Sequence, residues 1–440
     1  MAWIPLTPLA PISGAHAGLG RRARHDARAA QEFTLAVIPD AQNYLDYSHQ
    51  SRAGFPFDAH ALLDRQLEYV AANACGNGGD IAFVSVVGDV WQHPSLAIDP
   101  QSVARGYSAV FNPWLASVTT PTPYTRSLEL PAADAAFGRL AGAVPFGVAP
   151  GNHDYDAMYS DSRWPPASDV TDLDAGDPCS IGMLHIGGLD NFRRVFGASS
   201  RFFEGLPWYV SSYRGGGDSA QLFSAGGFIF LHIALEMDAP GEALFWAMQV
   251  LDAFPGLPTI VTTHDYLDTD GRRRSDPIID PQRTDPTHND PQDVWDHFLS
   301  RNDQIFLVLC GHEHGEAFRV DDNIHGHPVV QILADYQDRR QVSVEQGLAE
   351  PAGLGDGWMR LLRFDMEAET PTLHARTYST YYDAYSTELP RFAAWYKEAE
   401  APGLSDEEFL AKGDFVVQLD GFRERFGRAA ELSFALAGGE

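Results

Sequence analysis

Short apolar runs, each ending in a polar loop, recur along the whole chain. β-Branched and aromatic residues dominate these runs, which is typical of buried strands. The runs that predict strands are residues 33–38, 80–87, 144–149, 208–213, 221–224, 228–233, 258–263, 304–309, 329–333, 359–364 and 372–377. Segments with apolar residues at helical spacing separate several of them and predict helices at 58–74, 101–118, 241–254 and 291–301.

The order of these segments indicates the fold class. In the first part of the chain, strand, polar loop and helix alternate, which is typical of an α/β protein whose strand ends carry the functional loops. Between residues 208 and 233, closely spaced strands with glycine-rich turns favour antiparallel hairpins. The runs at 329–333, 359–364 and 372–377 predict closing strands of a second sheet.

The chain divides into three parts. Residues 1–31 contain several prolines, and their arginines follow the apolar stretch, so they predict a poorly structured leader and lack the order of a secretory signal. Residues 32–385 form one domain with polar insertions at 155–200 and 268–291 that cap or flank a site. Residues 386–440 mix aromatic and charged residues and predict a helical extension packed on the outside of the domain.

Composition narrows the range of partners. The net charge is −29, and Lys397 and Lys412 are the only lysines, so wrapping by nucleic acid is excluded because phosphate backbones need a basic stripe. No apolar run is long enough to span a bilayer. We expect a secreted or periplasmic protein, although a high-salt cytoplasm would explain the acidic surface equally well. An anionic substrate would need a local positive charge, which a metal centre would supply.

Residues with metal-binding capacity follow five of the predicted strands. His312 and His314 follow the run at 304–309, and their imidazoles share one face because successive side chains of an extended segment alternate. This pair alone is equally consistent with two ordinary loop histidines. Four further strand ends carry Asp40 with Gln42, Asp89, Asn152 with His153, and His264. Loops at this position converge on one sheet edge, so their recurrence favours a metal site.

In their order along the chain, these residues resemble the motifs of the calcineurin-like metallophosphoesterase family. The matching blocks are Asp40-Ala41-Gln42, Gly88-Asp89, Gly151-Asn152-His153-Asp154, His264 and Gly311-His312-Glu313-His314. The resemblance covers residues 33–335 and implies a two-sheet β-sandwich flanked by helices, with the layers αββα. It also implies a dinuclear centre of two divalent metal ions, drawn from Mn, Fe, Zn and Mg.

The resemblance implies a role for each residue. One metal would be held by Asp40, Gln42, Asp89 and His314, and the other by Asp89, Asn152, His264 and His312. A hydroxide bridging the two metals would be the nucleophile that attacks phosphorus. His153 would bind no metal and would protonate the leaving alkoxide, while Asp154 would hold its ring in the required tautomer.

Gln42 departs from the family pattern, which has a histidine at this position. An amide oxygen is a weaker donor to soft transition metals than an imidazole nitrogen. Three outcomes are open: Gln42 binds the metal through its oxygen, a water fills the gap, or that metal exchanges readily. We expect the first. Gln92 occupies the position of the tyrosine found in the purple acid branch, so a tyrosinate–iron centre is not expected.

Four residues near the ligand loops are candidates for walls of the substrate site: Tyr44, Trp91, His93 and Tyr266. Ordinary packing explains the three aromatic side chains equally well. Cys75 and Cys179 would pair in an oxidising compartment, but their spacing does not decide this.

We therefore expect a metal-dependent hydrolase of phosphate esters that acts on a small monoester or diester. The alternative is a non-catalytic binding or scaffold protein with a degenerate metal site, in which Gln42 is the first loss. Retention of His153 and Asp154 favours the enzyme, because a degenerate site rarely keeps its acid and the partner of that acid. The sequence specifies neither the natural substrate nor the oligomeric state.

Overall fold

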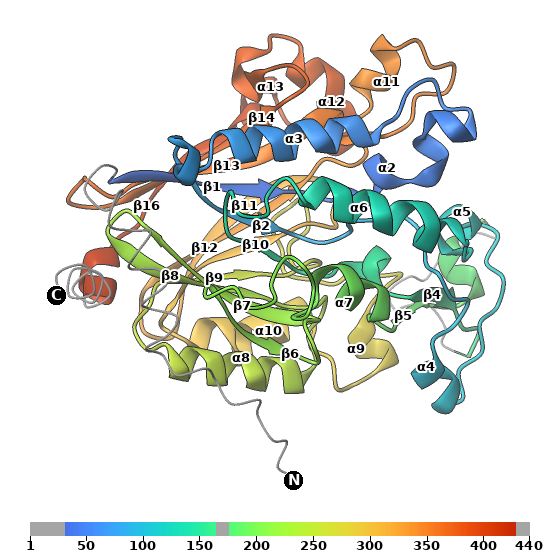
Figure 1. Cartoon of the computed structure of the whole chain (residues 1–440), viewed down its shortest axis with the longest axis horizontal. Coiled ribbons are helices and arrows are strands. Elements are labelled where there is room, and N and C mark those ends of the chain that lie inside the picture. Colours follow the sequence, from blue (N-terminus) through green and yellow to red (C-terminus); the bar gives the residue numbers. More distant parts are fainter. Residues whose placement is uncertain (1–30, 164–175, 428–440) are drawn as a thin grey trace.

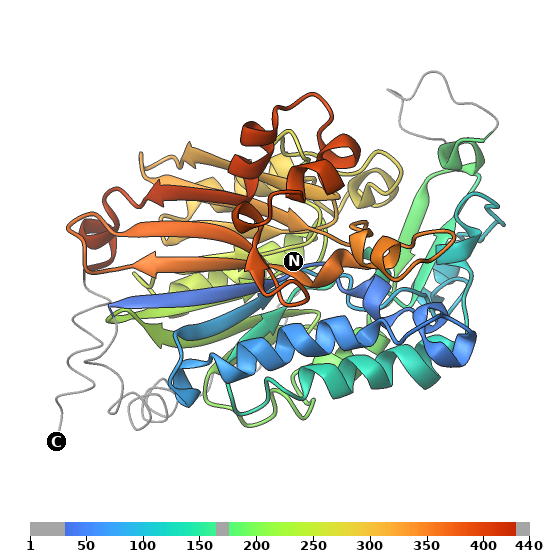
Figure 2. The ribbon, with the colours of Figure 1, turned by 90° about the horizontal axis from the view of Figure 1, so that it is seen from above.

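Two seven-stranded sheets pack face to face, and helices cover the outer face of each (Figures 1 and 2). The computed structural model describes residues 31–163 and 176–427, so all but the last residue of the expected leader at 1–31 lies outside the described residues. The layers run helix, sheet, sheet, helix, which confirms the two-sheet α/β arrangement.

Three parallel strands form the part of the first sheet that leads to the site: β1 (Glu32–Ile38), β2 (Ile81–Val86) and β3 (Phe146–Val148). The other strands of this sheet run antiparallel to their neighbours in the order β15-β14-β13-β1, and β16 also pairs with β14. Their bounds are β13 (Trp358–Asp365), β14 (Thr372–Ser379), β15 (Ala384–Tyr385) and β16 (Asp414–Gln418).

The second sheet has the order β11-β12-β10-β9-β8-β7-β6. Its four parallel strands are β8 (Phe228–Ala234), β9 (Thr259–Thr262), β10 (Ile305–Cys310) and β12 (Pro328–Asp335). The antiparallel strands at its edges are β6 (Tyr209–Tyr213), β7 (Asp218–Ala225) and β11 (Gly315–Asp322). The expectation that three late runs close one second sheet is wrong, because β12 joins this sheet whereas β13 and β14 join the first. Apolar alternation defines a strand but does not select its partner.

β1 is buried on both faces, and its alternation explains how the layers are held together. Phe33, Leu35 and Val37 face the core between the sheets, whereas Ala36 and Ile38 face the helices on the other side. The helices against the first sheet are α3 (His60–Ala72), α6 (Leu130–Phe137) and α7 (Asp190–Phe196). Those against the second sheet are α8 (Gly241–Ala253) and α10 (Pro291–His297).

Several segments differ from the sequence-based expectation. The single helix expected at 101–118 is replaced by α4 (Pro100–Ala104) and α5 (Ala116–Thr119), because Gly106, at φ 83°, and Pro113 interrupt the helical path. The insertion at 155–200 contains α7 and a two-stranded sheet of β4 (Ala157–Ser160) and β5 (Leu184–Gly187).

The remaining helices are short or lie in the C-terminal segment: α2 (Gln42–Leu45), α9 (Pro281–Thr284), α11 (Gln341–Glu345), α12 (Phe392–Glu400) and α13 (Asp406–Gly413). The segment at 386–440 was expected to be helical, but β16 also lies in it and extends the first sheet. Within the described ranges, no helix is both long enough and apolar enough to cross a bilayer. The side chain of Cys179 lies outside the described part of the chain, and so does its suggested pairing with Cys75.

Candidate metal centre

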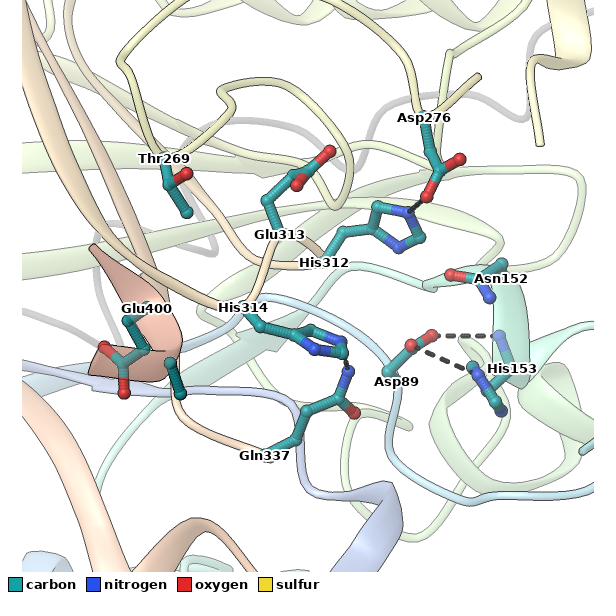
Figure 3. Close-up of a pocket in the computed structure, with 11 residues that line it drawn as sticks. Asp89, Asn152, His153, Thr269, Asp276, His312, Glu313, His314, Gln337 and Glu400 are labelled. Carbon is teal, nitrogen blue, oxygen red and sulfur yellow. Dashed lines mark hydrogen bonds and ion pairs between the residues drawn. The ribbon is translucent and has the colours of Figure 1, made fainter. Parts of the chain in front are cut away.

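Six parallel strands of the two sheets end at one edge of the sandwich, and residues that follow five of them line a cavity of about 410 Å³ (Figure 3). The strands are β1, β2 and β3 of the first sheet and β9, β10 and β12 of the second. The described residues that line the cavity are Asp89, Asn152, His153, Thr269, Asp276, His312, Glu313, His314, Gln337, Ala399 and Glu400. No arginine or lysine is among them.

Nitrogen and oxygen atoms converge around the fully buried ring of His264. Its Nδ1 lies 2.9 Å from the carbonyl oxygen of Val87 and donates to it, so Nε2 is the ring nitrogen that faces the site. This Nε2 lies 3.0 Å from Asn152 Oδ1, 3.3 Å from Asp89 Oδ1 and 3.2 Å from His312 Nδ1. Two of these neighbours are acceptors without a hydrogen, so a shared cation is favoured at this point. Asp89, His264 and His312 are therefore able to hold a metal ion.

The backbone fixes the two carboxylates of the site. The peptide N–H of His153 donates to Asp89 Oδ1 at 2.9 Å, and that of His312 donates to Asp40 Oδ2 at 3.0 Å. The residues preceding Asn152 and His312 are glycines because a Cβ there would overlap Asp89 Oδ1 and Asp40 Oδ1 respectively. The glycines of the two sequence motifs thus leave room for the carboxylates that face them.

Electrostatics support a cation in the same place. Burial opposes ionisation of Asp89, but contacts with His264 and His153 outweigh it and lower the pKa of Asp89. Burial alone would lower the pKa of His312, yet the carboxylates of Asp265 and Asp276 raise it well above its ordinary value. Positive charge is therefore stabilised where these side chains meet.

A second group of oxygens lies on the Asp40 side of Asp89. Asp40, Gln42 and Asp335 are each at least 98% buried, and Asp40 Oδ1, Gln42 Oε1 and Asp335 Oδ2 have no hydrogen-bond partner among the described residues. The amide nitrogen of Gln42 donates to Asp89 Oδ2 at 3.2 Å. Burial, together with the negative charges of Asp335 and Asp89, raises the pKa of Asp40 well above its ordinary value. Unpartnered buried oxygens of this kind are suited to a divalent cation.

His314 is the most exposed of the expected ligands, with 44% of its side chain accessible. Its Nδ1 lies 2.7 Å from Asp338 Oδ2, and its Nε2 contacts the Gln337 amide nitrogen (Figure 3). Burial would lower the pKa of His314, but Asp338 and Asp335 raise it to about 9. A carboxylate on one ring nitrogen is the usual partner of a metal-binding histidine.

His153 lies beside this centre, and its ring is oriented differently from the sequence-based expectation. Its Nδ1 lies 2.7 Å from the carbonyl oxygen of Gln92, and its Nε2 lies 3.9 Å from Asp89 Oδ2. Asp154 instead accepts the backbone N–H groups of Val90 and Gly151, each at 2.9 Å. The expected role of Asp154 is wrong because the 3₁₀ turn Asn152–Asp154 directs its carboxylate inward, where it ties the loops after β2 and β3 together.

The four expected wall residues, Tyr44, Trp91, His93 and Tyr266, are buried, and none of them lines the cavity. Tyr44 and Tyr266 have their hydroxyls engaged by Gly357 N–H and by Gln331 Oε1. The ring nitrogens of His93 lie 2.7 Å from Glu129 Oε1 and 3.1 Å from the carbonyl oxygen of Ser117, so neither is available to a substrate. Packing accounts for all four side chains.

The sequence-based interpretation missed Asp335 and most of the cavity wall. Asp335 is the last residue of β12, so the strand-end rule that selected the other ligands would also have selected it. Asp276 lies in the insertion at 268–291 and Glu400 in α12, and neither carries a local signal of its position.

Comparisons with known proteins add little to this picture. No family model matches the chain, and no curated protein matches its sequence. Among solved structures, the chain is similar to GAP50, described as the anchor in the inner membrane complex of Plasmodium, with 11% sequence identity and a TM-score of 0.36. That alignment covers 80% of this chain and 86% of GAP50.

Proposed function

We propose that the protein is a metal-dependent hydrolase of phosphate esters. The observation that carries the proposal is a cluster of nitrogen and oxygen atoms at the wall of an open cavity. Asn152 Oδ1 and Asp89 Oδ1 lie 3.0 Å and 3.3 Å from His264 Nε2. Two divalent ions bound at this sheet edge would neutralise phosphoryl oxygens and lower the pKa of a bound water to near neutrality.

The residues of the chain supply orientation and proton transfer. Asp89 lies between the two groups of ligands, because its Oδ1 faces His264 and its Oδ2 faces Gln42. The Nδ1–H of His153 is held by the carbonyl of Gln92, so Nε2 is the atom that exchanges a proton. We assign to this Nε2 the protonation of the departing ester oxygen, the general acid role of an oriented imidazole.

The charge of the cavity favours one kind of ester. Asp276, Glu313 and Glu400 contribute carboxylates to its wall, and no arginine or lysine lines it among the described residues. A phosphodiester carries one negative charge, whereas a monoester carries about 1.5–2 near neutral pH. The raised pKa values of His312 and His314 suit one phosphoryl charge, whereas the three carboxylates disfavour further negative charge, so a small diester, or an ester whose alcohol part is uncharged, is favoured.

The test is hydrolysis of para-nitrophenyl phosphate and of bis(para-nitrophenyl) phosphate with added Mn²⁺, with and without a chelator. We expect chelator-sensitive hydrolysis, faster for the diester, that is lost in His264→Gln. A matched control is His185→Gln, because His185 is a buried histidine of β5 outside the cavity. If the protein binds Mn²⁺ but hydrolyses neither ester, the alternative of a binding or scaffold protein replaces the enzyme.

A further inference from the structure

We infer that Asp335 is a direct ligand of the metal ion on the Asp40 side, and that this half of the centre is built mainly from oxygen. The inference rests on the proposed function, since it concerns one half of the same dinuclear centre. It assigns a ligand to a residue outside the motifs of the sequence, and it predicts a preference of that half for Mn²⁺ or Mg²⁺ over Zn²⁺.

The position of Asp335 is determined by the second sheet. It ends β12, pairs with Gly315 at the start of β11, and is fully buried. Its Oδ1 accepts the N–H of Gln337 at 2.9 Å, while its Oδ2 has no hydrogen-bond partner within residues 31–163 and 176–427 and lies 4.0 Å from His314 Nε2. The free oxygen thus points toward the expected ligands, and the other oxygen holds the carboxylate in place.

Burial of this carboxylate requires a compensating positive charge. An ionised carboxylate taken out of water without a partner costs several kcal/mol. Asp40 is a second buried carboxylate, and its Oδ1 also has no hydrogen-bond partner in the described part of the chain. Among the described residues, the cationic partner of Asp335 is His314, at 4.0 Å, and neither carboxylate forms an ion pair with an arginine or lysine. A divalent cation held by Asp335 and Asp40 would offset the burial of both carboxylates and would also give Gln42 Oε1 a partner.

The donor set explains why glutamine is acceptable at position 42. A neutral amide in place of a neutral imidazole replaces a strong donor with a weaker one, and the carboxylate of Asp335 would add a further ligand that carries a negative charge. Carboxylate and amide oxygens suit Mg²⁺ and Mn²⁺, whereas imidazole suits Zn²⁺. The half built from His264 and His312 keeps its nitrogen ligands, so the two halves differ in the metal that they prefer.

The first test measures metal stoichiometry by mass spectrometry and Mn²⁺ affinity by titration calorimetry. The wild-type protein should bind two Mn²⁺ per chain. In Asp335→Asn, we expect the affinity for one of them to fall by more than about 100-fold, beyond the range for loss of an outer-shell partner. Asp99→Asn is the matched control, because Asp99 is also buried and also has one unpartnered oxygen, and it should keep both ions.

The second test avoids the variant in case it fails to fold. Anomalous diffraction from a wild-type crystal soaked in Mn²⁺ should place one ion within bonding distance of Asp335 Oδ2. An ion bridged to Asp335 by water, or an affinity loss of only about 10–100-fold, would overturn the inference. If Asp335 binds the ion but neither ester is hydrolysed, the proposed function fails while this ligand assignment stands.

Discussion

His232 in β8 should make the protein less stable in mild acid. Its ring is fully buried between the sheets, with Nδ1 2.7 Å from Gln221 Oε1 and Nε2 2.9 Å from Thr262 Oγ1. Burial lowers the pKa of His232 to about 3, from an ordinary value of 6.5. The folded state therefore keeps this ring neutral, whereas the unfolded chain takes up a proton below pH 6.5. Its contribution to stability is complete above that pH and is lost progressively as the pH falls toward 3.

The size of the effect follows from the linkage between proton binding and unfolding. Each pH unit between the two pKa values changes the free energy of unfolding by about 1.36 kcal/mol. A pH of about 5 lies about 1.5 units below the ordinary histidine value and above the folded-state value, so His232 should cost the protein about 2 kcal/mol there. This is a large fraction of the net stability of about 5–15 kcal/mol that is typical of a folded domain.

The assay is urea unfolding of the wild type and of His232→Gln at about pH 7.5 and about pH 5. Glutamine keeps a hydrogen-bonding group in the core but cannot take up a proton. The other histidines and carboxylates are common to both proteins, so the difference between the two pH-dependent changes isolates His232. We expect the variant to lose about 2 kcal/mol less than the wild type on acidification. Equal losses in the two proteins would refute the argument.

Two further predictions concern the core and the site. Glu316 is buried and pairs with Arg360 at 3.0 Å. The substitution Glu316→Gln should lower the free energy of unfolding, measured in urea, by about 3–5 kcal/mol. Glu32 pairs with Arg363 at the surface, so Glu32→Gln should lower the free energy of unfolding by less than about 1 kcal/mol. Similar losses in the two variants would show that burial does not strengthen the Glu316 pair. Gly311→Ala should lower the Mn²⁺ content of the protein, because the added methyl overlaps Asp40 Oδ1; an unchanged content would show that Asp40 is not a ligand.

The general plan of the site could be predicted from the sequence for a clear physical reason. Asp40, Asp89, Asn152, His264 and His312 each follow an apolar strand, and parallel strands bring such positions to one sheet edge. Glycines before Asn152 and His312 strengthened the pattern. The structure shows that the facing carboxylates require these glycines. Alternating burial on β1 likewise follows directly from the two-residue period of a strand.

The cavity wall could not be predicted, because it depends on contacts between distant segments. Trp91 comes two residues after Asp89 in the same loop, yet its ring packs against Phe196 in the core rather than in the cavity. Once the strand has ended, the sequence has no regular alternation that shows whether a side chain points into the core or into the cavity. Glu400 reaches the cavity because α12 packs against Tyr336, just after β12, and Trp358 of β13, and Arg339 donates to its carboxylate at 2.8 Å.

The two halves of the centre are held in different ways, and their ion affinities should differ accordingly. His264 and Asp89 are oriented by backbone groups, and His312 keeps a left-handed φ of 71°. On the other side, the Gln337 amide occupies Nε2 of His314, so an ion that uses this nitrogen must displace it. Titration with Mn²⁺ should therefore show a tighter and a weaker binding event. Gln337→Ala should strengthen only the weaker event, and two equal events in the wild type would show that this amide is no barrier.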